Sequence, residues 1–209
     1  MPPPQGVVNL TASASIEVPK DWISVTLSTQ REGSDAGPVQ AALKTALDTA
    51  LQEARRAARP GQLEVQTGLF ALSPRYTGKG QSNGWQGSAE LLIEGRDMAA
   101  IAQLTGRIGT LSIARVAYGL SREQRLKAEA DVTSQAINNF RVRAAQASTL
   151  FGFGSHVIRE VSLSSNEAQP YPMATRARTL AMASDEALPV EAGKATVTVT
   201  VSGSVQMLK

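Results

Sequence analysis

One stretch, "SREQRLKAEADVTSQAINNFRVRAAQASTLFG" at 121–152, constrains the fold of this chain more than any other. Apolar and small side chains recur in it at alternating spacings of four and three residues, at Leu126, Ala130, Thr133, Ile137, Phe140, Ala144, Ala147 and Phe151. This spacing predicts a single α-helix with a continuous seam along one face. Because half of the seam positions are Ala or Thr, the helix can approach its partner closely.

The seam has two interpretations. In the first, the helix packs on a β-sheet of the same chain. In the second, its heptad-like spacing joins two protomers in a coiled coil, although the flanking positions lack complementary charges. The sequence favours the first and leaves the second open. The helix is expected to end at Gly152, because glycine readily adopts the left-handed conformation of a C-cap.

Both ends of the sequence predict β-strands. From Val8 to Val18 apolar residues alternate with polar ones, as a strand with one buried face requires. The same alternation resumes at Ile23 after a break at 19–21, which suggests a hairpin. The last segment, from Ala195 to Met207, alternates as regularly as the first.

The segments between these ends complete an α+β pattern. A helical stripe from Val39 to Ala57 stops at 60–61, and a β pair follows over 63–76 and 85–94, joined by a turn. Asp97 is a candidate N-cap for a short helix, and strands follow over 111–120 and from Ser155. The predicted order is ββα-ββα-βα-β-loop-β, with mostly antiparallel sheets and long helices packed on one face.

We expect a single domain over 1–209. The order of elements also allows it to be divided into two ββα-type halves, at about 7–95 and 96–209. Residues 166–193 are rich in Pro, Met and Ala and show no steady period, which predicts a long loop. Such loops often serve as interaction surfaces. Its candidate interaction residues are Pro170, Tyr171, Met173, Arg176, Arg178 and Met182. Thioether side chains can adapt to a ligand, but of the two interpretations the sequence favours an ordinary surface loop.

Residues with recognisable chemistry are scarce. The chain contains no cysteine and a single histidine, His156, which lies in a strand pattern and suits a half-buried structural position. We therefore expect no metal site, no cofactor and no catalytic residue. "GKGQS" at 78–82 lies between two strands and is interpreted as a hairpin turn, not a phosphate-binding loop.

Charge and hydropathy exclude several partners. Lys and Arg total 21 against 18 Asp and Glu, without a cluster of cations, so nucleic acid is not an expected partner. No apolar run reaches the ~18 residues of a membrane span. The start, "MPPPQG", lacks the features of a signal peptide. If the protein is exported, we expect its export segment to have been removed.

Five segments in this order resemble the SIMPL-domain family, long described as a domain of unknown function. They are the opening "VVNLTASASIEVPKDWISVTLS", the strand "VQTGLFALSPRY", "VAYGLS", "AAQASTLFGFGSHVIREVS" and "LPVEAGKATVTVTVSGSVQM". Two features depart from the family pattern. Phe140 replaces a small residue, and Ala192-Gly193 replaces Pro-Gly before the last strand.

The resemblance implies an exported, bacterial α+β protein, periplasmic or secreted, without established catalytic residues. The family includes periplasmic immunogenic proteins and an envelope protein linked to oxidative stress, and some members resemble ring or channel-like assemblies. It thus implies a non-enzymatic envelope protein that self-associates and supports stress tolerance, with an envelope protein or a small ligand as further partners. A ligand- or peptide-binding module using residues 166–193, and an enzyme with an unfamiliar carboxylate site, are the alternatives.

Overall fold

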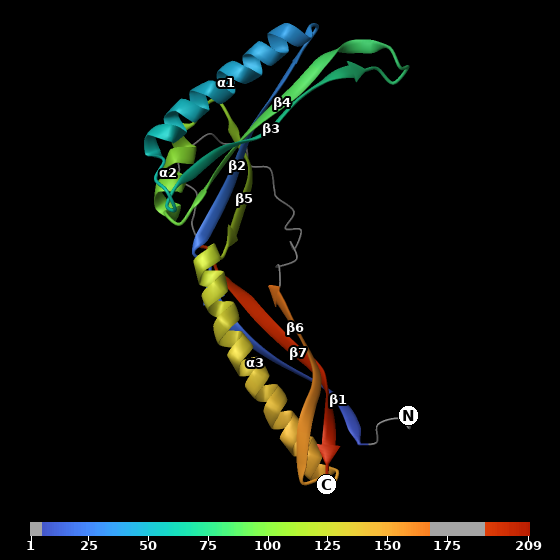
Figure 1. Cartoon of the computed structure of the whole chain (residues 1–209). Helices are drawn as coiled ribbons and strands as arrows, with labels where there is room; N and C mark the ends of the chain where they lie inside the picture. Colours follow the sequence, from blue (N-terminus) through green and yellow to red (C-terminus); the bar gives the residue numbers. More distant parts are fainter. Residues whose placement is uncertain (1–5, 168–190) are drawn as a thin grey trace. The chain divides into compact units, whose positions relative to one another are not determined.

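The structure, a computed structural model, describes residues 6–167 and 191–209 (Figure 1). The described residues form, in chain order, β1 Val7–Pro19, β2 Trp22–Gly33, α1 Ala36–Ala57, β3 Glu64–Tyr76, β4 Ser82–Gly95, α2 Met98–Arg107, β5 Ser112–Gly119, α3 Arg122–Leu150, β6 Ser155–Glu167 and β7 Lys194–Leu208. All strand pairs are antiparallel, which confirms the predicted α+β class.

The described residues divide into two compact units, each with its own sheet. The first unit comprises 6–20, 122–167 and 193–209, and the second comprises 21–121 with 191–192. The boundary at about residue 95 that two ββα halves would give runs through the second unit, between β4 and α2. The single domain over 1–209 and its two halves stay a prediction.

The predicted hairpin between the first two strands is wrong. β1 pairs with β7 in one sheet, whereas β2 pairs with β4 and β5 in the other. The break at 19–21 therefore carries the chain from the first unit into the second. Alternation identifies a strand and its buried face, but it does not identify the partner strand.

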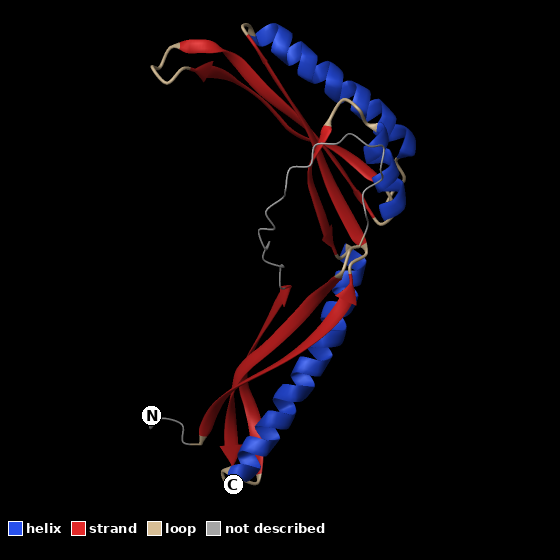
Figure 2. Cartoon of the chain, turned by 180° about the vertical axis from the view of Figure 1, so that it is seen from behind, coloured by secondary structure: helices blue, strands red, loops and turns tan. Residues whose placement is uncertain are grey.

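The first unit is a three-stranded sheet, in the order β1-β7-β6, with α3 on one face (Figure 2). In β7 the odd-numbered side chains from Ala195 to Val201, and again Val205 and Met207, are buried. Their neighbours in β1 alternate in the same phase, so Ile16 lies opposite Val197 and Ala12 opposite Val201. The two terminal strands, β1 and β7, thus together supply the sheet side of the first unit's core.

The buried stripe of α3 differs from the predicted seam. The buried residues are spaced by four throughout, at Ala128, Val132, Ala136, Phe140, Ala144 and Ser148. Of the predicted seam, Leu126, Ile137 and Phe151 are exposed. A spacing of four exceeds one helical turn by about 40° at each step, so the stripe winds around the helix. A winding stripe keeps the helix in contact with a twisted sheet along its length.

A glycine in the central strand accommodates the largest side chain of this stripe. Phe140 is fully buried over Gly203 of β7. A Cβ atom on Gly203 would lie 3.2 Å from Cζ of Phe140 and 2.3 Å from the backbone oxygen of Glu160. Only a residue without a side chain fits between the ring and the neighbouring strand.

In the second unit, too, a strand glycine lies beneath a large buried side chain of the covering helix. Its sheet has the order β3-β4-β2-β5, and α1 and α2 pack on one face. A Cβ atom on Gly87 of β4 would lie 2.6 Å from Cδ1 of Leu43, which is fully buried on α1. The core is completed by the inward residues of β2 and β4, from Ile23 to Leu27 and from Ala89 to Ile93.

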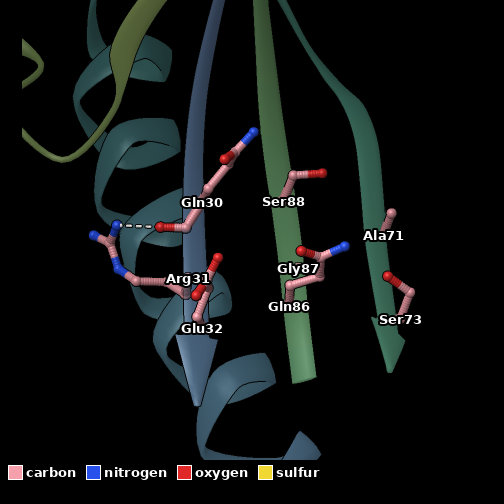
Figure 3. Close-up of a pocket in the computed structure, with 8 residues that line it drawn as sticks. All are labelled: Gln30, Arg31, Glu32, Ala71, Ser73, Gln86, Gly87 and Ser88. Atoms are coloured by element: carbon pink, nitrogen blue, oxygen red, sulfur yellow. Dashed lines mark hydrogen bonds between the residues drawn. The ribbon is translucent and has the colours of Figure 1, made fainter. Parts of the chain in front are cut away.

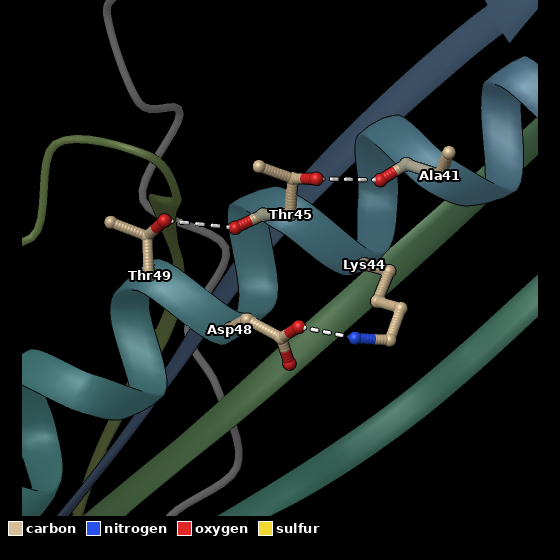
Figure 4. Close-up of polar contacts among 5 residues, drawn as sticks. All are labelled: Ala41, Lys44, Thr45, Asp48 and Thr49. Atoms are coloured by element: carbon tan, nitrogen blue, oxygen red, sulfur yellow. Dashed lines mark hydrogen bonds and ion pairs between the residues drawn. The ribbon is translucent and has the colours of Figure 1, made fainter.

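The outward face of α1 is polar. Lys44 pairs with Asp48 one turn later (Figure 4). The hydroxyl of Thr45 donates to the carbonyl of Ala41, and that of Thr49 donates to the carbonyl of Thr45. These contacts lie within the helix and leave this face as an ordinary solvated surface.

Two predicted helix ends are confirmed. The Asp97 carboxylate accepts a hydrogen bond from the amide of Ala100 at 3.0 Å, as an N-cap does. Gly152 has φ +78°, and the amide of Phe153 donates to the carbonyl of Ser148 at 2.8 Å. This pattern is a Schellman motif at the end of α3.

Replacing Gly203 by alanine should destabilise the first unit. The added methyl group has no space between Phe140 and the backbone of Glu160, and overpacking of this kind costs roughly 1–3 kcal/mol. Urea denaturation followed by circular dichroism measures the change. Gly154→Ala is the control, because a Cβ there would meet nothing closer than 3.8 Å. Equal stability of both variants would contradict the packing described here.

Candidate interaction surface

β6 is an edge strand with exposed apolar side chains. Among the described residues it pairs with β7 only. The exposed fractions are 52% for Val157, 42% for Ile158, 46% for Val161 and 49% for Leu163. In the described part of the chain, no β6 residue belongs to the buried core of the first unit. The strand therefore presents an apolar surface that α3 covers only in part.

An irregularity in β6 directs three of these side chains to the same face. The register with β7 shifts between Ile158 and Glu160, as in a β-bulge. On the far side of the shift, Val161 lies opposite Gly203 and Leu163 opposite Val201, whereas Ile158 lies opposite Val205. All three partners belong to the face of β7 that carries α3. The bulge thus keeps Ile158 on that face despite its even number.

α3 adds a side chain to this surface. Asn139 and Arg143 lie on its β1 side, because they donate hydrogen bonds to backbone carbonyls of β1. Helical periodicity then puts Ile137, three residues before Phe140, on the opposite side of the buried stripe, toward β6. Ile137 is also exposed. We call Ile137, Ile158, Val161 and Leu163 the β6 flank.

The other edge of this sheet is protected. The side chain of Asn139 donates to the carbonyl of Ser13 at 3.1 Å, and Arg143 donates to the carbonyl of Thr11 at 2.6 Å. Thr11 and Ser13 are two residues apart, so their carbonyls point to the same edge of β1. Side chains that occupy edge carbonyls hinder the addition of a further strand.

A small polar groove lies on the sheet face of the second unit that α1 leaves open (Figure 3). Its lining includes Gln30 and Glu32 of β2, Gln86 and Ser88 of β4, and Ser73 of β3. The groove has a volume of about 170 Å³, below the ~300–1,000 Å³ of most small-molecule sites, which are also mainly apolar. Its residues are those of a solvated sheet face.

A charged cluster in the second unit is fully engaged in holding strand ends together. The carboxylate of Asp21, directly before β2, accepts hydrogen bonds from the amide and the hydroxyl of Ser121, both at 2.6 Å. Arg96 donates to the same hydroxyl at 2.9 Å. Ser121 is buried. Because these groups satisfy one another, we assign the cluster a structural role.

The structure describes some of the residues that the sequence analysis singled out and leaves others outside the described ranges. Pro170, Tyr171, Met173, Arg176, Arg178 and Met182 lie outside the described residues, so the interaction role of 166–193 stays a prediction. His156 lies half-buried in β6, opposite Met207, as expected. The predicted turn at 78–82 is confirmed by the hydrogen bond from the amide of Thr77 to the carbonyl of Gln81.

The β6 flank was not among the predicted sites. Its signal was present in the sequence, since Val157 and Ile158 are adjacent and Val161 and Leu163 follow at strand spacing. An alternating strand with one buried face cannot bury two adjacent apolar residues.

Within residues 6–167 and 191–209, no three His, Cys, Asp or Glu side chains are arranged to hold a metal ion. In the same part of the chain, no helix combines the length and the apolar character needed to cross a membrane.

Comparison with known proteins identifies the family. No curated protein matches the chain. The model of the SIMPL family, described as a protein of unknown function (DUF541), matches residues 8–205. The match runs from β1 to β7 and so spans both units. On this match, the chain belongs to the SIMPL family.

Proposed function

We propose that the chain is a non-enzymatic, exported cell-envelope protein that self-associates and supports tolerance to stress. The observation that carries the proposal is the β6 flank together with the unpaired edge of β6 in the described part of the chain. Export and the stress role are supported by the resemblance to SIMPL-family envelope proteins.

The β6 flank supports self-association on energetic grounds. Burying a valine or leucine side chain completely contributes roughly 1.5–3 kcal/mol. Val161 and Leu163 are each about half exposed, so each retains on the order of 1 kcal/mol that a partner surface would recover. A long edge strand with apolar side chains is also a template for pairing with another chain.

Light scattering on the purified chain tests the self-association. We expect a mass above the 22.0 kDa of one chain, and Val161→Arg should shift the protein toward monomers because it puts a charge on the β6 flank. Val142→Arg is the matched control, since both valines are 46% exposed and belong to the first unit. Thermal melting verifies that both variants fold. A wild-type chain that stays monomeric at high concentration would refute the proposal.

Cell fractionation tests the location. A tagged copy expressed from the native gene, with whatever leader that gene encodes, should be found in the envelope or the medium. Recovery of the mature protein solely with cytosolic markers would contradict an envelope role and leave the self-association to be judged by light scattering.

A further inference from the structure

The two edges of the three-stranded sheet differ in whether side chains bond to their backbone carbonyls. At the β1 edge, Asn139 and Arg143 of α3 bond to the carbonyls of Ser13 and Thr11. At the β6 edge, the structure records no such contact along 160–166, among the described residues. The β6 edge is thus the one at which a further strand can add.

We propose that β6 pairs antiparallel with β6 of a second copy, about a two-fold axis at Ser162, and so joins two sheets into one of six strands. This pairing rests on the proposed self-association, and it identifies the edge of β6 as the surface through which two copies associate. The strand that adds at this edge comes from a second copy of the chain, because the sequence of β6 is complementary to itself in one register.

The register follows from matching side chains across the axis. With Ser162 on the axis, Val161 of each copy lies opposite Leu163 of the other, both on the face that carries α3. On the open face Ser162 lies opposite itself and Glu160 opposite Ser164. The central apolar residues Val161 and Leu163 then meet each other, and no charge faces a like charge.

Neighbouring registers match less well. An axis at Glu160 puts two carboxylates opposite each other, which is destabilising. An axis at Val161 puts Leu163 opposite Arg159, at the bulge. An axis at Leu163 puts the two Leu163 side chains opposite each other but puts Val161 opposite Ser165 in both copies, so it has one apolar pair where the Ser162 register has two. The register at Ser162 is therefore the one that hydrophobic matching selects.

Pairing also extends the apolar surface without crowding α3. α3 packs on β1 and β7 and leaves β6 outside its core. The added strand therefore lies beside β6 and away from Phe140. The two β6 flanks meet across the axis and form one continuous apolar strip, whose central members are the two Val161 and the two Leu163 side chains.

Single cysteines test the register, because the chain has none of its own. Residues directly opposite in an antiparallel pair have Cα atoms about 4.5–5.5 Å apart, within the roughly 4.4–6.8 Å that a disulfide spans. Ser162→Cys should therefore give a disulfide-linked dimer under mild oxidation, and reduction should reverse it.

Ser164→Cys is the matched control. Ser162 and Ser164 are both exposed serines on the open face of β6. In the proposed register the two Ser164 residues are offset by four positions, about 13 Å along the strand, so this variant should stay uncrosslinked. The double variant Glu160→Cys/Ser164→Cys should crosslink, because these positions face each other across the axis.

The outcomes separate the pairing from the proposed function. Selective crosslinking of S162C, and of the double variant, supports the pairing. Equal crosslinking of S162C and S164C overturns the register. If neither crosslinks while light scattering finds oligomers, another surface mediates assembly, and the pairing fails although self-association stands. A monomeric wild-type chain removes the self-association and the pairing with it.

Discussion

The contact between Phe140 and Gly203 determines how the first unit is built. The ring occupies the space that a side chain at position 203 would fill, which fixes α3 over the central strand of its sheet. In the second unit Leu43 fills the space left by Gly87 in the same way. In both units, a glycine within an inner strand of the sheet selects where the covering helix lies and how closely it approaches.

This position of α3 accounts for the exposure of β6. One helix is about 10 Å wide, whereas three strands span roughly 10 Å between their outer axes and more with their side chains. Because α3 is centred on β7 and shifted toward β1, where Asn139 and Arg143 bond to the strand, it covers β6 only in part. The apolar residues of β6 are therefore left at the surface by the same packing that forms the core.

Local features of the fold could be predicted from the sequence, and choices of partner could not. Alternation from Val8 to Val18 and the cap residues Asp97 and Gly152 depend on near neighbours, and they were identified. The partner of β1 is nearly two hundred positions away, so proximity suggested a hairpin with β2 that does not form. The predicted seam of α3 is wrong at Leu126, Ile137 and Phe151, because a heptad repeat follows a straight line whereas a twisted sheet requires a winding stripe.

The asymmetry between the two sheet edges gives the bulge in β6 a specific consequence. A bulge usually disfavours edge-to-edge pairing, but this one lies at Ile158–Glu160, near one end of β6. It limits regular pairing to the part of the strand from Glu160 onward, which is the part that contains Val161, Ser162 and Leu163. A strand protected at one end and regular at the other restricts the registers available to a partner. At the opposite edge, Asn139 and Arg143 occupy the carbonyls of β1, so a further strand can add at the β6 edge but not at the β1 edge. Pairing of two β6 strands about a two-fold axis uses this edge in both copies, and assembly through it therefore stops at a dimer.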